Sequence, residues 1–251
     1  MEASSTPAES SRARKKPSKP KTGENKPQPG SSKLRGLDKD SPEVRTSKTL
    51  SWLLRHGAKS EGLAMRPDGY VKVADLLANS RLASLNLEAL QAIVKADLKQ
   101  RYDLLFEEES GIWWMKANQG HSIKSVKLDL APISCVSDIP SGIAVHGTTK
   151  KAWESIATQG LSKMKRNHIH LAQGLAGDKV VSGMRGQSQI LIFIDVQRAM
   201  DDGVKFFLSD NGVVLTEGNE KGILETRYFQ RVETADRAPV PGWEEQSERV
   251  K

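Results

Sequence analysis

The chain has 251 residues, a formal net charge of +7 and a single cysteine, Cys135. One cysteine excludes an internal disulfide, which favours a reducing compartment, and no run approaches the ~18 consecutive apolar residues that cross a bilayer. We therefore expect a cytoplasmic or nuclear protein of one or two domains with no membrane partner.

The positive charge is concentrated in the first 40 residues. This segment holds ten Lys and Arg against five Asp and Glu, so it carries +5 of the total +7. It is rich in Ser, Pro, Lys and Gly, and it has too few large apolar side chains to offset the entropy cost of folding. Residues 1–40 are predicted to be a disordered basic tail, which is either an import signal, a loose RNA-tethering arm or a solvated tail of no specific role.

Residues 41–125 have the pattern of helices followed by a hairpin. The stretch SKTLSWLLRHG places Leu50, Leu53 and Leu54 on one helical face. Gly57 is predicted to end this helix as its C′ residue.

Arg55 and His56 are predicted to occupy the last turn of that helix. Cations are favoured there by the helix dipole alone. The pair is therefore either an ordinary capping charge or a rigidly mounted anion site, and the helix itself leaves both interpretations open.

Two more helices and a strand–turn–strand follow. VKVADLLANS predicts a short strand entering a short helix, and RYDLLFEEESGIWWMKA predicts two strands around a turn at residues 108–111. LNLEALQAIVKADLK predicts a helix with one apolar face, formed by Leu87, Leu90, Ile93, Val94 and Leu98. Three helices and a terminal hairpin are typical of winged-helix modules, which bind nucleic acid or protein.

Residues 126–141 contain two prolines and are predicted to be an extended linker with one short strand. A second domain is expected over residues 142–233, with a C-terminal tail over 234–251. Its predicted elements are a strand in IAVHGTT, a helix in KKAWESIATQGL, a strand in RNHIHLA, a buried strand in ILIFIDV, a hairpin in KFFLSDNGVVLTE and a last strand in ILETRYFQRV. Many short strands with two short helices predict an α+β fold built on a split sheet.

Six motifs, in this order, resemble the NAD-dependent RNA 2′-phosphotransferases: LLRHG, DLKQRY, ANQGHS, HGTT, KRNHIHLA and DNGVVLTE. The resemblance covers roughly Ser47 to Phe229. It implies an N-terminal winged-helix RNA-binding lobe and a C-terminal ADP-ribosyltransferase-like lobe that binds NAD as a co-substrate.

The activity that the resemblance implies is tRNA 2′-phosphotransfer, the last step of tRNA splicing. The splice-junction 2′-phosphate of ligated tRNA is transferred to NAD, which gives 2′-hydroxyl RNA, nicotinamide and ADP-ribose 1″,2″-cyclic phosphate. The expected partner is tRNA or another RNA that bears a 2′-phosphate. A metal is not expected, and the oligomeric state is expected to be monomeric.

The family's essential residues map onto Arg55, His56, Arg101 and Arg166. Planar guanidinium groups suit the oxygens of a dianionic phosphate, so the arginines are given electrostatic roles. His56 is the candidate for bonding the phosphate or for giving a proton to the leaving RNA oxygen, because histidine titrates near neutral pH.

The resemblance also implies an NAD-binding set, comprising His146, Gly147, Thr148, His168, His170 and Val213. Which of the two strand histidines contacts NAD is left open. Related transferases carry a glutamate where Val213 falls, and a 2′-phosphate, already anionic, needs no such base.

Three further positions are noted without an assigned role. Ala172 stands where the family usually has a serine, which puts a contact to nicotinamide in doubt. Arg185 serves either the adenine side of the NAD site or the surface. His121 either reaches the phosphate across the cleft or is a linker histidine.

Two alternatives to this activity are carried forward. One is ADP-ribosyl transfer to a terminal phosphate of nucleic acid, or to protein. The other is a catalytically inactive winged-helix RNA-binding protein, which would bind RNA in a salt-sensitive manner and release no nicotinamide.

Overall fold

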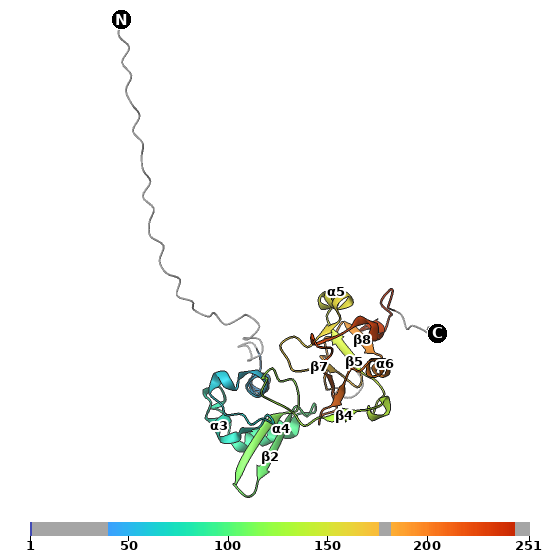
Figure 1. The fold of residues 1–251 in the computed structure, drawn as a ribbon. Coiled ribbons are helices and arrows are strands. Elements are labelled where there is room, and N and C mark those ends of the chain that lie inside the picture. The colour runs from blue at the N-terminus through green and yellow to red at the C-terminus, as the bar shows by residue number, and fades with distance from the viewer. Residues whose placement is uncertain (2–39, 176–181, 244–251) are drawn as a thin grey trace.

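The structure is a computed structural model, which describes residue 1 and residues 40–175 and 182–243. The predicted basic tail therefore lies almost wholly outside the described residues, as does the end of the predicted C-terminal tail. Helices and small sheets alternate along the chain in Figure 1, which confirms the predicted α+β class. Within the described ranges, no helix is both long and apolar enough to cross a membrane.

The first lobe packs its helices against one side of a three-stranded sheet of order β1-β3-β2. Its helices are α2 (Pro42–Trp52), a π-helical turn (Leu53–Gly57), α3 (Val73–Ala78), α4 (Leu87–Ala96) and two 3₁₀ turns (Lys59–Glu61 and Ser80–Leu82). Its strands are β1 (Val71–Lys72), β2 (Tyr102–Glu107) and β3 (Ile112–Ala117). The predicted order of helices and the predicted terminal hairpin are thus confirmed.

The predicted apolar face of the first helix forms the centre of this lobe's core. Leu50, Leu53 and Leu54 are each 0% exposed. The prediction for the third helix is wrong at Leu98, which is 76% exposed. The reason is that α4 ends at Ala96, so Leu98 leaves the helical face before the chain enters β2.

Gly57 does not end the first helix, contrary to the prediction. The backbone stays helical at the next residue, and Gly62, with φ of 70°, supplies the left-handed C-cap. Gly57 is needed for a different reason: a Cβ at this position would lie 2.6 Å from ring atoms of Trp52. The glycine allows the indole ring to pack against the helical backbone.

The second lobe contains two sheets, of order β4-β9-β10-β7 and β12-β8-β5, and a small pair, β11-β6. The strands are β4 (Ala131–Ile133), β5 (Val145–Thr148), β6 (Leu161–Ser162), β7 (Ile169–Leu171), β8 (Ile190–Ile194), β9 (Phe206–Leu208), β10 (Val214–Thr216), β11 (Ile223–Leu224) and β12 (Phe229–Thr234). The helices are α5 (Lys150–Gln159), α6 (Val196–Asp201) and two 3₁₀ turns (Val136–Asp138 and Thr226–Tyr228).

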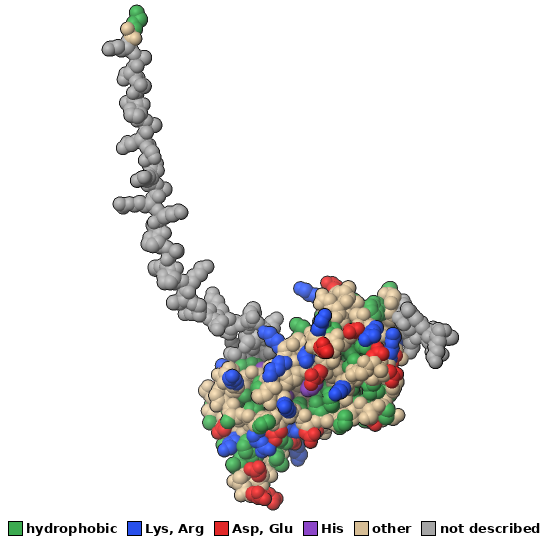
Figure 2. Space-filling view, viewed as in Figure 1, with side chains coloured by type: hydrophobic (Ala, Val, Ile, Leu, Met, Phe, Trp, Pro, Cys, Tyr) green, Lys and Arg blue, Asp and Glu red, His purple; other side chains and the backbone are tan. Residues whose placement is uncertain are grey.

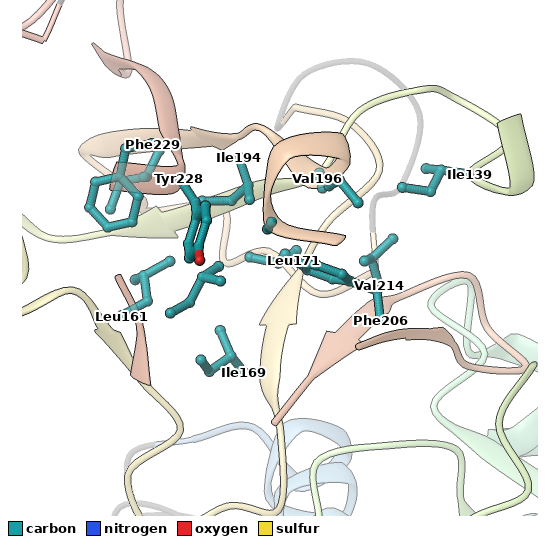
Figure 3. Close-up of a cluster of buried hydrophobic side chains, with 14 of the residues drawn as sticks. Ile139, Leu161, Ile169, Leu171, Ile194, Val196, Phe206, Val214, Tyr228 and Phe229 are labelled. Atoms are coloured by element: carbon teal, nitrogen blue, oxygen red, sulfur yellow. The ribbon is translucent and has the colours of Figure 1, made fainter. Parts of the chain in front are cut away.

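The two sheets separate between β5 and β7, where a single bridge joins them. Val145 and Ala172 exchange backbone hydrogen bonds of 2.9 and 2.8 Å there. Side chains of both sheets fill the core that Figure 3 shows, with Leu171 from one sheet and Ile194 from the other. The predicted split sheet is therefore present, and its seam lies beside His146 of β5 and His170 of β7.

Two other predictions need comment. The stretch ILETRYFQRV forms parts of two strands, β11 and β12, because a 3₁₀ turn at Thr226–Tyr228 redirects the chain from β6 to β8. The strand expected between residues 126 and 141 is β4, and it pairs with β9 of the second lobe. The connection between the lobes thus supplies an edge strand to the larger sheet.

Candidate active site

Arg55 and His56 lie side by side in the π-helical turn Leu53–Gly57. Single π-helical turns within helices occur frequently at functional sites. Leu53 and Leu54 of the same turn are fully buried. The pair is therefore fixed to the core of the first lobe.

Residues 118–122, which we call the strap, run past this pair after β3. The Asn118 N–H donates to the Arg101 carbonyl over 2.9 Å, and the Ser122 N–H donates to the Arg55 carbonyl over 2.9 Å. The strap thus holds the backbones of two of the predicted arginines in fixed relation to each other.

The strap also contacts the second lobe near the third predicted arginine. The Asn167 N–H donates to the carbonyl of His121 over 2.8 Å, and Asn167 directly follows Arg166. Gly120, with φ of 91°, passes so close to Arg55 that a Cβ would lie 3.3 Å from its Cδ. This close approach explains the glycine, and it encloses the Arg55 side chain.

Arg101 follows the end of α4 and is oriented by Asp97, four residues earlier. The guanidinium of Arg101 forms an ion pair with the Asp97 carboxylate. The other oxygen of that carboxylate accepts the Arg101 N–H over 2.6 Å. The carboxylate of Asp97 therefore positions Arg101.

Arg166 lies three residues before β7 and points toward His170. Its Nη1 is 3.5 Å from Nδ1 of His170. A guanidinium can only donate, so Nδ1 of His170 accepts and the ring proton is on Nε2. That Nε2 is buried and has no hydrogen-bond partner among the described residues.

Arg55 is the most unusual of the three arginines. Its Nε and Nη2 are buried and have no hydrogen-bond partner within the described part of the chain. Burial lowers the pKa of Arg55 to about 10, and the charges of Arg166 and Arg101 act in the same direction, against Tyr102 and Asp97. Buried donors without an acceptor are rare in folded proteins, so this arrangement calls for an anionic ligand.

The histidines of the site are held neutral. Burial lowers the pKa of His56 to about 4, assisted by the charges of Arg166 and Arg55. Burial likewise lowers the pKa of His146, and it lowers the pKa of His170 well below its usual value. Neutral imidazole rings add hydrogen-bonding groups to the site without adding to the repulsion among the arginines.

On the seam of the second lobe, His146 and Gly147 have defined roles in the fold. Nδ1 of His146 lies 3.0 Å from the His170 carbonyl, which only accepts, so the ring proton is on Nδ1. A Cβ on Gly147 would lie 2.8 Å from Cβ of Ser188 and 2.9 Å from Cγ of Met184. Glycine here lets residues 182–188 pack against β5.

The remaining predicted residues surround this seam. Thr148 ends β5 and is half-buried, and its carbonyl accepts the Gln189 N–H over 2.7 Å. Val213 is 0% exposed and packs against Gly183. His168 packs its ring edge-on against Phe207, with centroids 6.4 Å apart.

The structure also places the three positions left without a role. Ala172 forms the bridge between the two sheets described above. Arg185 is exposed, and its charge lowers the pKa of both Arg166 and His146. His121 is 2% exposed, and neither of its ring nitrogens has a partner among the described residues.

The lobes are tied together at Lys99. Its carbonyl accepts hydrogen bonds from Ser182 Oγ (2.8 Å) and Asn211 Nδ2 (3.0 Å), and its Nζ donates to the Met184 carbonyl over 3.0 Å. Lys99 stands between Asp97 and Arg101. This contact between the lobes therefore lies in the segment that carries Arg101.

Sequence reasoning missed several residues that shape the site, namely Asp97 as the partner of Arg101, and Asn118, Gly120 and Ser122 of the strap. The motif ANQGHS marked the strap as a loop, and its glycine was the one signal of a close backbone approach. Nothing in the pattern indicated that Ser122 Oγ would lie 2.9 Å from Nδ1 of His56.

The charge of this site differs from that of the surface around it. On the face shown in Figure 2, Lys and Arg side chains are interspersed with Asp and Glu over both lobes. At the site the charges of Arg166 and Arg101 lower the pKa of Arg55, and the charge of Arg185 lowers the pKa of Arg166. Within the described ranges, no three His, Cys, Asp or Glu side chains are grouped as metal ligands. The arrangement can bind a compact, multiply charged anion and orient it through fixed donors.

Comparison with known proteins agrees with this geometry. The sequence profile of the RNA 2′-phosphotransferase, Tpt1/KptA family matches residues 41–218. The tRNA 2′-phosphotransferase 1 of Danio rerio is 45% identical over 197 residues, which cover 78% of this chain and 88% of that protein. The tRNA 2′-phosphotransferase of Saccharomyces cerevisiae is 38% identical over 190 residues, which cover 72% of this chain and 81% of that protein.

A protein of Schizosaccharomyces pombe is 49% identical over 194 residues, which cover 77% of this chain and 52% of that protein. This chain thus matches about half the length of that relative. The range that the family profile matches, residues 41–218, contains Arg55, Arg101, Arg166 and Arg185. The chain is a member of the RNA 2′-phosphotransferase, Tpt1/KptA family.

Proposed function

We propose that this protein removes the 2′-phosphate from RNA, with the splice junction of ligated tRNA as its substrate and NAD as the co-substrate that accepts the phosphate. The observation that carries the proposal is the pair of buried nitrogens of Arg55 that have no partner among the described residues and lie among the charges of Arg101 and Arg166. A phosphomonoester carries about two negative charges near neutral pH and offers three acceptor oxygens. It supplies the acceptors that Arg55 lacks.

The proposed chemistry has two steps. An oxygen of the RNA 2′-phosphate attacks C1″ of NAD and nicotinamide leaves; the O2″ hydroxyl then attacks phosphorus, the bond from phosphorus to the RNA O2′ breaks, and the proton of O2″ ends on O2′. The products are 2′-hydroxyl RNA, nicotinamide and ADP-ribose 1″,2″-cyclic phosphate.

The arginines act on the phosphate in both steps. They neutralise the dianion and hold its oxygens in a fixed orientation while charge redistributes around phosphorus. Because guanidinium groups do not release protons, the proton that reaches O2′ requires another group. His56 is that group: its neutral ring passes the Nε2 proton to the departing oxygen and takes up the proton that O2″ releases, so the ring ends as it began.

The NAD side of the proposal is supported by the seam of the second lobe. His146 presents an unprotonated Nε2, which is an acceptor for a ribose hydroxyl, whereas His170 has a buried Nε2–H with no partner in the described part of the chain. Arg185 lies close enough to affect the pKa of His146, and its charge suits a diphosphate. We assign the NAD site to this seam, with Gly147, Thr148 and His168 nearby.

Val213 fits a phosphate acceptor. Val213 is fully buried, and its N–H donates to Ser209 Oγ over 2.9 Å. This position therefore contributes an apolar side chain and no carboxylate. An attacking 2′-phosphate is already anionic and needs no carboxylate to remove a proton. A neutral hydroxyl acceptor would need one.

The finer fold assignments belong to this proposal. We infer that the first lobe is a winged-helix RNA-binding lobe and that the second is an ADP-ribosyltransferase-like NAD-binding lobe. The order of α2, α3, α4 and the β2–β3 hairpin supports the first assignment. The two sheets that part between β5 and β7 support the second.

One incubation tests the proposal. The protein is mixed with a short RNA bearing one internal 2′-phosphate, with and without NAD, and the products are resolved by mass. We expect NAD-dependent 2′-hydroxyl RNA together with ADP-ribose cyclic phosphate. Accumulation of ADP-ribosylated RNA alone would replace the proposal with plain ADP-ribosyl transfer, and no consumption of NAD would overturn both.

A further inference from the structure

His56 and His146 face the site from opposite lobes, and their Nδ1 atoms have different partners. Nδ1 of His146 lies 3.0 Å from a backbone carbonyl, that of His170. Nδ1 of His56 lies 2.9 Å from the hydroxyl oxygen of Ser122. A carbonyl only accepts, whereas a hydroxyl either donates or accepts. The partner at Nδ1 determines what Nε2 of the same ring can do.

A dianionic phosphate at this site imposes a condition on His56. The phosphate oxygens are acceptors, so a neutral ring must present an Nε2–H to them. This tautomer leaves a lone pair on Nδ1, and Nδ1 then needs a donor. Had a carbonyl occupied the place of Ser122 Oγ, it would have fixed the proton on Nδ1 and turned a lone pair toward the anion.

We propose that Ser122 is a positioning residue, whose hydroxyl donates to Nδ1 of His56 and thereby holds the His56 ring as its Nε2–H tautomer, facing the 2′-phosphate. The inference deepens the proposed function and rests on it for the identity of the anion. The two histidines are then opposite tautomers: His56 is a donor through Nε2, and His146 is an acceptor through Nε2.

The position of the Ser122 hydroxyl is itself fixed by the strap. The Ser122 N–H donates to the Arg55 carbonyl over 2.9 Å. One residue earlier, the His121 carbonyl accepts the Asn167 N–H of the second lobe over 2.8 Å. Both backbone bonds restrict the strap, so Ser122 Oγ is held in place before any ligand binds. This is the preorganisation that a positioning residue requires.

The first test reads the tautomers directly. The full chain is labelled with ¹⁵N at its five histidines, and long-range proton–nitrogen spectra near pH 7 show which ring nitrogen carries the proton. Signals are assigned by their loss in His56→Gln and His146→Gln. We expect the proton on Nε2 of His56 and on Nδ1 of His146. A proton on Nδ1 of His56 would overturn the proposal.

The second test compares Ser122→Ala with Ser122→Thr. Loss of a neutral hydrogen bond costs about three- to tenfold in rate, so Ser122→Ala is expected to lower kcat on 2′-phosphorylated RNA by that factor, with the KM for NAD unchanged. Its His56 spectrum is expected to show both tautomers. Ser122→Thr, which keeps the hydroxyl, is expected to restore kcat and the single tautomer.

A matched control is Ser60→Ala, because the Ser60 hydroxyl donates to the Gly57 carbonyl over 2.9 Å at the end of the same turn. This variant should match the wild type in both readouts. If Ser122→Ala keeps a single Nε2–H tautomer, the proposal is overturned whatever its kcat. The spectra are recorded without substrate. Failure of the protein to remove 2′-phosphates would therefore disprove the proposed activity, and the tautomer of His56 would still test the role of Ser122.

Discussion

Asn211 donates through Nδ2 to the carbonyl of Lys99 over 3.0 Å and joins the turn of the β9–β10 hairpin to the segment that carries Arg101. The turn was recognisable in the sequence as Asp-Asn-Gly, but its contact with the other lobe was not. Because Lys99 lies two residues before Arg101, the second lobe helps to position an arginine that belongs to the first.

The Asn211→Ala variant tests this connection. The lost hydrogen bond is worth about 1 kcal/mol, which corresponds to roughly fivefold in rate if it is lost from the transition state. We expect kcat/KM for 2′-phosphorylated RNA to fall by about that factor. Steady-state kinetics measure it.

The neighbouring residue provides the control. Asp210 also reaches the first lobe, through an ion pair of 3.0 Å with Lys116, but its side chain is 54% exposed. Exposed ion pairs contribute little. Asp210→Ala should retain wild-type kinetics at physiological salt, and an equal loss in both variants would contradict a specific role for Asn211.

Arg55→Lys should remove most of the activity. Lysine keeps the charge but lacks the planar fork that matches phosphate oxygens, and loss of a fixed donor to a transition state costs about 100-fold or more. The measurement is kcat/KM on 2′-phosphorylated RNA, with NAD binding followed by calorimetry. NAD affinity should persist, since Arg55 belongs to the first lobe. Arg198→Lys, at an exposed position of α6, serves as the control.

Replacing Arg55 by Met should stabilise the ligand-free protein while abolishing turnover. The buried Nε and Nη2 have no partner in residues 40–175 and 182–243, and each unsatisfied buried group costs about 1–3 kcal/mol. A methionine of similar length removes that cost. Urea unfolding in the absence of ligands measures the change, and a lower unfolding free energy for Arg55→Met would show that Arg55 contributes to the fold.

Features that depend on residues close together in the sequence were predicted, and features that depend on contacts between distant residues were not. The first helix, the hairpins and strand β8 follow from local periodicity and turn residues, and they are confirmed. The two-residue strand β6 carries no periodicity and was missed, and the two-residue strand β11 was not separated from β12. The order of strands in the sheets could not be predicted either, because pairing between distant strands leaves no local signal in the sequence.

The same limit applies to individual residues. Gly57 has the sequence signature of a helix terminator, yet the reason for a glycine at this position is the close packing of the Trp52 ring. Likewise, the role of Ser122 depends on His56, which lies 66 positions away. The motifs marked the arginines, but the residues that orient them were found only once the fold was known.

Buried His121 should make folding sensitive to mild acid. Burial lowers its pKa from 6.5 to about 3, and Arg55, His56, His168 and Lys116 act in the same direction. Because the folded pKa is lower, the unfolded chain binds the proton more readily between about pH 6.5 and pH 3, so stability falls as the pH drops through this window.

The variant His121→Leu isolates that contribution. Between pH 7 and pH 5 the wild type should lose about 2 kcal/mol more unfolding free energy than the variant, because His121 alone accounts for that difference. Chemical denaturation at the two pH values measures it. Equal losses would show that His121 is accessible to protons in the folded state.

Gly57→Ala should destabilise the first lobe and reduce activity together. Its Cβ would lie 2.6 Å from the Trp52 ring, and overpacking of this kind costs about 1–3 kcal/mol. The matched control is Gly186→Ala, because a Cβ at Gly186 meets nothing within 4 Å. Thermal melts and kcat on 2′-phosphorylated RNA report the two effects, and wild-type values for Gly57→Ala would show that the ring can move aside.

The π-helical turn that carries Arg55 and His56 makes the length of this helix as important as its composition. A π-helical turn takes up one residue more than an α-helical turn, and each residue of an α-helix corresponds to about 100° of rotation, so a deletion after Trp52 that this turn did not absorb would rotate Arg55 and His56 about the helix axis. The two side chains would then point to a different side of the helix. Such a shortened chain would still contain every arginine and histidine of the site, yet it would present them to the wrong surroundings.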